Sequence, residues 1–164
     1  MSIFPEIELN SILKFGITTD QISAFDILCL PENIAAVASI DDLYDASDAI
    51  VLSKLLKIQG LNCANSYDLH LPCRVLERRS KEKWFGMVFI RKNVVIPLFV
   101  SVLGNLISSE IADAPKDKQQ PIPKIHIELK IKKPNCITSI KYDGDASTLI
   151  TILKNIEADT TDSE

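Results

Sequence analysis

Hydrophobic and polar residues follow distinct patterns along the chain, and these patterns predict an α/β fold. The run IAAVASI at 34–40 is continuous, small and β-branched, which is typical of a buried parallel strand. Apolar residues at helical spacing follow at 49–59, with Gly60 at the helix end, and a second short strand is indicated by LNCANS at 61–66. We therefore predict a β-α-β unit over 34–66 with a right-handed crossover.

The middle of the chain predicts a polar helix, a buried strand and an apolar helix. Residues 74–84, RVLERRSKEKW, have the composition of a solvated basic helix, and FGMVFI at 85–90 indicates a third buried strand. The segment 93–109 contains no charge, and Pro97 suits the first turn of a helix. Because this segment is shorter than the roughly 20 apolar residues that span a bilayer, we predict a buried helix near 94–111. A membrane-inserting helix is the alternative.

Strict alternation of apolar and polar residues appears near the C-terminus. In IHIELKI, at 125–131, every second residue is Ile or Leu, as expected of a strand with one buried face. The short connection KKPN leads to CITSIKY at 136–142, so we predict an antiparallel hairpin. DGD at 143–145 indicates a turn in which Asp145 caps a closing amphipathic helix at 146–156.

Together these elements predict a three-layer, flavodoxin-like α/β sheet. It has a parallel N-terminal β-α-β unit, a C-terminal antiparallel hairpin and a closing helix. Residues 1–30 show no clean period, and we expect an N-terminal extension with one or two short helices or an extra strand. We place a single α/β domain at 31–157 and a frayed polar tail at 158–164.

Composition and charge narrow the classes of function. The 164 residues are 46% hydrophobic and 24% charged, which excludes a mostly disordered chain. The net charge is -4, and because acids outnumber bases we expect no nucleic-acid partner. The four Cys are widely spaced and form no CxxC pair, so we expect no metal site and no cofactor. The N-terminus does not resemble a signal peptide, and we expect a cytoplasmic protein with reduced thiols.

The loops after the first two predicted strands contain the polar cluster that is best placed to bind a ligand. In an open parallel sheet, ligands bind beyond the carboxyl ends of the strands. The loops 41–48 and 66–73 meet this condition, although helix capping by Asp45 or Ser47 explains part of the same composition. The residues expected to bind a ligand are Asp41, Asp42, Tyr44, Ser66, Tyr67 and Asp68.

A basic segment beside an acidic half of the chain indicates a surface for a partner. Residues 1–73 contain ten acids against three Lys, whereas residues 74–92 contain seven bases against two acids. The partner is expected to be a larger protein subunit or a second copy of this chain. The residues expected to bind it are Arg74, Arg78, Arg79 and Trp84.

The order of elements also resembles a known family. A strand ending in acids (AAVASIDD), a helix ending QG, the strand LNCANS, the loop DLHLP, a basic helix and the strand GMVFI resemble Toll/interleukin-receptor domains and their flavodoxin-like relatives, from about Asn33 to Ile156. Enzymatic members of that family hydrolyse NAD with a Glu on the helix after the third strand. The corresponding stretch here has no Glu before Glu110, so the resemblance implies a non-catalytic relative.

The second half of the chain, from Trp84 to Ile156, is similar in layout to the effector-associated constant components of bacterial conflict systems. Both resemblances imply an accessory of antiviral defence or signalling. We therefore expect a non-catalytic interaction or adaptor subunit of such a bacterial system. The alternatives are a nucleotide-binding or nucleotide-processing domain that uses the loops 41–48 and 66–73, and a membrane-active effector that uses 93–109.

Overall fold

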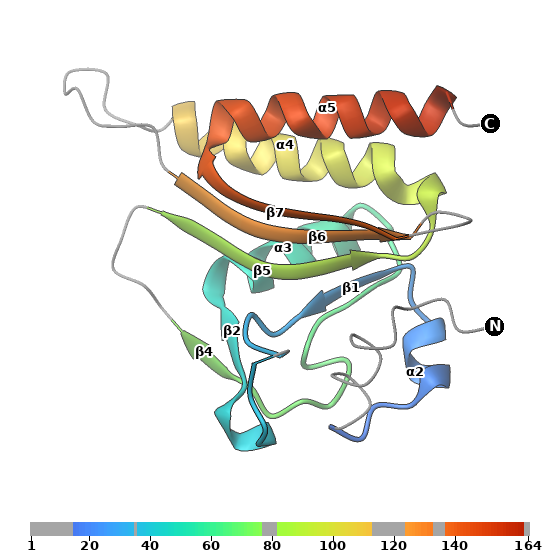
Figure 1. The fold of residues 1–164 in the computed structure, drawn as a ribbon, viewed down its shortest axis with the longest axis vertical. Helices are drawn as coiled ribbons and strands as arrows, with labels where there is room; N and C mark the ends of the chain where they lie inside the picture. Colours follow the sequence, from blue (N-terminus) through green and yellow to red (C-terminus); the bar gives the residue numbers. More distant parts are fainter. Residues whose placement is uncertain (1–14, 35, 77–81, 113–123, 133–136, 163–164) are drawn as a thin grey trace.

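The helices and strands of the chain are arranged around one central sheet (Figure 1). The structure, a computed structural model, describes residues 15–34, 36–76, 82–112, 124–132 and 137–162. Its strands are β1 (Ile27–Leu30), β2 (Tyr44–Ala46), β3 (Cys63–Ala64), β4 (Arg74–Leu76), β5 (Lys83–Ile90), β6 (Lys124–Lys132) and β7 (Ile137–Asp145). Its α-helices are α2 (Thr19–Ser23), α3 (Ser47–Ile58), α4 (Ile96–Ala112) and α5 (Ala146–Asp162), with short 3-10 helices η1 (Ile40–Asp42) and η2 (Asn93–Val95).

The central sheet is mixed and has the strand order β3-β1-β5-β6-β7. The pairs β1–β3 and β5–β6 are parallel, whereas β1–β5 and β6–β7 are antiparallel. A second, two-stranded sheet consists of β2 and β4 in parallel. The α/β class is therefore confirmed, and so are the C-terminal antiparallel hairpin and its closing helix. The flavodoxin-like arrangement is not confirmed, because β5 runs antiparallel to β1 at the centre of the sheet.

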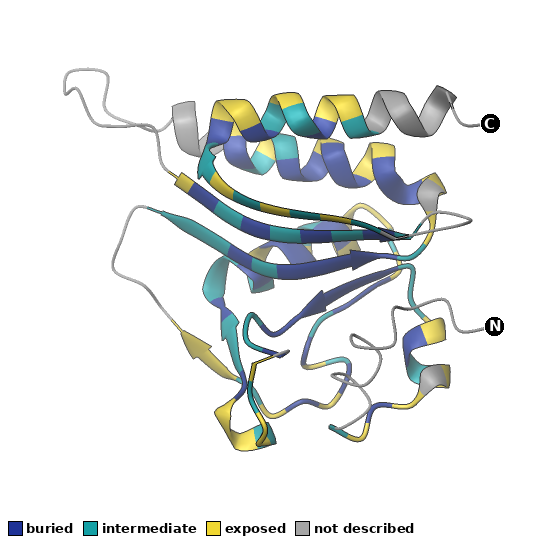
Figure 2. Ribbon diagram, in the orientation of Figure 1, coloured by how far each residue is buried: buried dark blue, intermediate teal, exposed yellow. Residues whose placement is uncertain are grey.

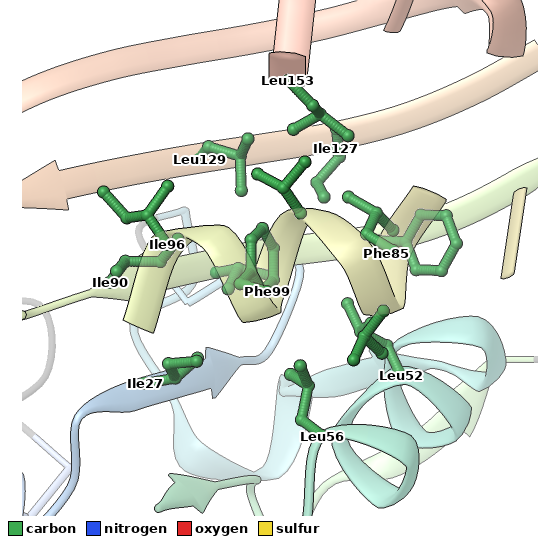
Figure 3. Close-up of a cluster of buried hydrophobic side chains, with 14 of the residues drawn as sticks. Ile27, Leu52, Leu56, Phe85, Ile90, Ile96, Phe99, Ile127, Leu129 and Leu153 are labelled. Carbon is green, nitrogen blue, oxygen red and sulfur yellow. The ribbon is translucent and has the colours of Figure 1, made fainter. Parts of the chain in front are cut away.

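Three helices cover one face of the central sheet. Figure 3 shows residues of α3, α4 and α5 in one buried cluster with the strands beneath them. This cluster includes Leu52, Leu56, Phe99, Leu103 and Leu153 from the helices and Ile27, Phe85, Ile127 and Leu129 from the strands. Because these side chains lose contact with water on folding, their burial contributes much of the stability of the fold.

The opposite face is covered only over part of the sheet. Leu28 and Phe89 pack there against Ile22 of α2 and against buried loop residues such as Leu43 and Leu71. In β6 the residues that alternate with the buried ones are half-buried and polar (Figure 2). These are His126, Glu128, Lys130 and Lys132. The sheet therefore passes from a covered to an open face between β5 and β6.

The apolar segment 93–109 forms the buried helix that its composition predicts. Ile96, Phe99, Leu103 and Ile107 of α4 lie three to four residues apart and are all buried in the cluster on the sheet. In the described part of the chain, no helix combines the length and the apolar character that crossing a bilayer requires. The apolar side of α4 thus packs against the sheet and α5.

The prediction of a strand at 34–40 is wrong. The chain turns there, with hydrogen bonds from the Ile34 amide to Pro31 O and from the Ala36 amide to Asn33 O. The strand that pairs with β3 is instead β1, within the segment predicted to be an extension. Its four residues ILCL are all buried, and their larger side chains fill the core better than the Ala and Ser residues of 34–40.

The prediction of a basic helix at 74–84 is also wrong. Arg74–Leu76 forms β4 and pairs with β2, and Lys83 and Trp84 begin β5. The rest of that stretch, 77–81, lies outside the described residues. Both strands form through partners distant in sequence, which a local helical composition does not reveal.

The C-terminal predictions are confirmed with altered boundaries. The residues DGD continue β7 rather than turn, since Gly144 pairs with Ile125 and Asp143 with His126. Asp145 caps α5 as predicted, because its Oδ2 accepts a hydrogen bond of 3.2 Å from the Thr148 amide. The helix α5 extends to Asp162 and so includes part of the segment predicted as a tail.

Gly86 occupies a bulge in β5 where only glycine fits without strain. Its φ is +67°, and a Cβ would lie 3.3 Å from Leu30 O. We expect Gly86→Ala to lower the free energy of unfolding by about 1–2 kcal/mol, as measured by urea denaturation. The matched control is Gly104→Ala in α4, where no atom lies within 4 Å of the new Cβ. It should raise stability by about 0.5–1 kcal/mol, and equal stability of the two variants would contradict this account.

Candidate functional site

A hollow with a mostly apolar lining lies beside the N-terminus of α3. We name it the Asp45 cavity. It has a volume of about 370 Å³ and lies between β2, the first turn of α3, the loop after β3, and β4. It is lined by Cys29, Asp45, Ala49, Ile50, Asn65, Ser66, Tyr67, Leu71, Pro72, Cys73 and Val75.

The loop after β3 is held in shape by hydrogen bonds between its own residues. The Asn65 amide donates to Asp68 Oδ2 at 2.9 Å, and the Asp68 amide donates to Asn65 Oδ1 at 3.0 Å. His70 has a left-handed φ of 59°, which reverses the chain so that the Leu71 amide reaches Ser66 O at 2.9 Å. These bonds place Ser66 at the wall of the Asp45 cavity.

Asp45 is the acidic group of this cavity. Its Oδ1 accepts a hydrogen bond of 2.7 Å from Ser66 Oγ. Burial raises the pKa of Asp45, and the hydrogen bond from Ser66 offsets part of that rise. The prediction that Asp45 or Ser47 caps the following helix is wrong, because Ala46 is the N-cap and supplies no side-chain hydrogen bond.

Thiols line the cavity next to this carboxylate. Burial raises the pKa of Cys73 to about 11, with the negative charge of Asp45 adding to the effect and a hydrogen bond from Ser66 opposing it. The contact of Cys29 Sγ with Cys63 Sγ at 3.7 Å, together with burial and Asp45, raises the pKa of Cys29 well above its ordinary value. Both thiols are therefore neutral near pH 7.

A second polar site lies on the open face of the central sheet. The register of β5, β6 and β7 aligns Trp84 with His126 and His126 with Asp143. These three residues line a hollow of about 360 Å³, which we name the Trp84 groove. Its other lining residues are Glu32, Asn33, Ala36, Tyr44, Gly86, Ile127, Glu128 and Lys141.

His126 is held from three sides in the Trp84 groove. Its Nδ1 lies 2.6 Å from Asp143 Oδ1, and its Nε2 lies 3.1 Å from Glu82 Oε2. The Trp84 ring stacks on the imidazole with centroids 3.6 Å apart and an interplanar angle of 12°. Each ring nitrogen of His126 therefore faces a carboxylate, while the indole packs against the face of the imidazole.

The residues predicted to bind a ligand are divided among several places. Ser66 and Tyr67 line the Asp45 cavity, and Tyr44 lines the Trp84 groove. Asp41 and Asp42 are exposed in η1 and line neither hollow.

Asp68 has a structural partner instead of a place in a cavity wall. It pairs with Lys57 of α3. Burial disfavours the charge of Asp68, but the hydrogen bond and charge of Lys57 and the Asn65 amide together lower its pKa. Asp68 therefore joins the loop after β3 to α3.

The residues predicted to bind a partner also occupy different settings. Arg74 is exposed in β4, and Trp84 is half-buried in β5, where its backbone amide donates to Asp48 Oδ2 at 2.9 Å. Arg78 and Arg79 lie outside the described residues. The structure thus places Arg74 and Trp84 on strands of two different sheets rather than on one helix.

Sequence reasoning missed the groups that organise the two sites. Asp45 was interpreted as a helix cap, and His126 was not singled out within the alternating segment 125–131. The alternating pattern of 125–131 did contain a usable signal, because pairing the hairpin across KKPN brings His126 opposite Asp143. In the described part of the chain, no group of three or more His, Cys, Asp or Glu side chains is arranged to hold a metal ion.

Comparisons of the chain with protein-family models, with curated proteins and with solved structures give no match. The resemblances to Toll/interleukin-receptor domains and to effector-associated constant components therefore stay predictions.

The raised pKa of Cys73 predicts slow alkylation of the folded protein. With a pKa of about 11, the thiolate fraction at pH 8 is roughly two hundredfold lower than for a thiol of ordinary pKa. We expect iodoacetamide to modify Cys73 about two hundredfold more slowly in the folded chain than in urea, as followed by peptide mass spectrometry. Because the folded state raises this pKa, the associated stability is complete below the unfolded pKa and is lost as pH rises towards 11. Equal rates in the folded and unfolded chain would refute the assignment.

The stack of Trp84 on His126 predicts a spectroscopic change, since the chain has one Trp and two His. We expect His126→Leu to change the intensity and wavelength of tryptophan emission, because the contact with the imidazole is lost. It should also lower the free energy of unfolding by about 1–2 kcal/mol, since Glu82 and Asp143 each lose their contact with the imidazole. The control His70→Leu, in an exposed loop, should leave the emission spectrum unchanged. The same spectrum for all three proteins would show that the stack is absent.

Proposed function

We propose that the chain is a non-catalytic interaction subunit that binds an extended segment of a partner protein along β4. The supporting observation is the exposure of apolar side chains on this short strand: Val75 is 51% exposed and Leu76 is 40% exposed. An exposed apolar strand favours association with another chain, and a partner that covers it removes this liability. Figure 2 shows β4 as exposed along its length.

The backbone of β4 is suited to pairing with an added strand. Among the described strands, β4 pairs only with β2. An extended peptide can use the backbone groups of such an edge for hydrogen bonds, while side pockets select its side chains. Leu76 and Trp84 line one hollow of about 190 Å³ beside this edge, which gives a partner side chain a place to bind. We name Arg74, Val75, Leu76 and Trp84 together the β4 surface.

Charge indicates the chemistry of the partner. Arg74 is exposed at the start of β4 and gives the β4 surface a positive charge. A segment with Asp or Glu residues would therefore associate faster and more selectively than a basic one. The resemblance to components of bacterial conflict systems favours a partner in antiviral defence or signalling.

The membrane alternative has less support than the interaction proposal. The apolar side chains of α4 that would enter a bilayer pack on the central sheet and against α5. Exposing them to lipid would require this cluster to open, at the cost of its buried contacts.

The β4 surface is tested with two variants and a matched control. We expect a stoichiometric partner, co-purified with the tagged full chain from its host, to be lost with Leu76→Asp, because a charge would enter an apolar contact. Trp84→Ala should weaken the isolated complex at least tenfold by calorimetry. Ile58→Asp is the control, since Ile58 is 76% exposed on α3, away from β4. A partner retained by Leu76→Asp, or one lost equally with Ile58→Asp, would rule out the β4 surface.

A further inference from the structure

The Asp45 cavity has the dimensions and lining of a small-molecule site. Its volume of about 370 Å³ lies in the range of about 300–1,000 Å³ that is usual for such sites. Ile50, Leu71, Pro72 and Val75 supply apolar walls, and the polar side chains are few. A mostly apolar cavity with a small number of directed polar groups binds a ligand by burial and orients it by hydrogen bonds.

Asp45 is the charged group in that wall, and only part of its hydrogen-bonding capacity is used. Among the described residues, its one side-chain hydrogen bond is from Ser66 to Oδ1, and it has no cationic partner there. Two carboxylate oxygens accept about four hydrogen bonds, so Oδ2 can receive donors from a ligand. Ser66 is itself buried and fixes the orientation of the carboxylate.

The other groups of the cavity favour a cation over an anion. The thiols of Cys29 and Cys73 stay neutral because burial and Asp45 oppose their ionisation. Among the described residues that line this cavity, Asp45 is thus the one with a charged side chain. A partly desolvated carboxylate without a counter-ion gains from a cation that hydrogen-bonds to it and repels an anion of the same shape.

Tyr67 indicates a flat ligand. It lines the cavity and is 86% exposed, so its ring is available at the mouth. An aromatic ring at an entrance can stack on a planar ligand and attract its positive charge.

We propose that the Asp45 cavity binds a small organic cation with a flat apolar body, whose N–H groups donate to the Asp45 carboxylate. The apolar body lies among Ile50, Leu71 and Pro72, and the Tyr67 ring covers it from the mouth. This site shares Val75 with the β4 surface, but its charged group, Asp45, does not belong to that surface. The ligand-binding role predicted for the loops 41–48 and 66–73 is thereby assigned to Asp45, Ser66 and Tyr67.

The proposal is tested with benzamidine as the probe and with the full chain. Benzamidine is planar, apolar on its ring and cationic at an amidinium that offers paired N–H donors. We expect saturable binding with a Kd on the order of 1 mM or below. The binding is measured by NMR from the chemical-shift changes at Tyr67 and Val75. Benzoate, with the same ring and the opposite charge, should not bind. Equal binding of benzoate, or no saturable binding of benzamidine up to about ten times that concentration, would overturn the proposal.

Variants localise the binding. Asp45→Asn keeps an oxygen for the Ser66 hydrogen bond and removes the charge, so the affinity for benzamidine should fall at least tenfold. Asp41→Asn makes the same change in charge on exposed η1 and should leave the affinity unchanged. Tyr67→Ala removes an exposed ring that the fold does not need and should weaken binding severalfold, which provides a test if Asp45→Asn fails to fold. Undiminished binding by Asp45→Asn or by Tyr67→Ala would contradict the assigned site.

Discussion

Burial of β5 on both faces is the constraint on which the rest of the structure depends. Phe85 and Val88 pack on the helix side of the sheet, whereas Met87 and Phe89 pack on the opposite side. A strand of this kind needs cover on both faces. The helices α3, α4 and α5 provide one layer, and α2 with its neighbouring loops provides the other. The second layer does not extend over β6, and the Trp84 groove lies at the boundary where the cover ends.

Elements formed by contacts within one segment were predicted correctly, whereas elements formed by contacts between distant segments were not. The strand β6 and the helices α3, α4 and α5 each bury one side. Apolar residues therefore recur at a regular spacing within each segment, and the sequence of that segment alone predicts the element. The errors at 34–40 and 74–84 concern pairing between distant segments. In the first case β1, and not the apolar segment 34–40, pairs with β3. In the second case β4 pairs with β2, which lies about thirty residues earlier in the chain. Neither pairing can be recognised within a single segment of the sequence, because each depends on which distant segment is better buried in the folded chain.

The residues of the two sites were likewise predictable only where a single segment of the sequence determines their position. Ser66 and Tyr67 were expected to bind a ligand because a loop after a buried strand lies at the sheet edge, and they do line a cavity. Asp45 was misassigned because an acid before a helix usually caps it. Here the helix begins after Ala46, and β2 directs the Asp45 carboxylate towards Ser66. The stack of Trp84 on His126 required the register of three strands, which no single segment contains.

Alternation along β4 directs neighbouring side chains into two different hollows. Val75 lines the Asp45 cavity, whereas Leu76 lines the hollow beside Trp84, as expected when successive side chains of a strand point to opposite faces. A three-residue strand with one described neighbour makes few backbone hydrogen bonds, so side-chain contacts contribute a large share of its stability. A change at Val75 therefore acts both on the wall of the cavity and on the β4 surface, whereas a change at Leu76 acts on the β4 surface and leaves the cavity lining intact. Leu76 can therefore be changed to examine partner binding without altering the wall of the Asp45 cavity.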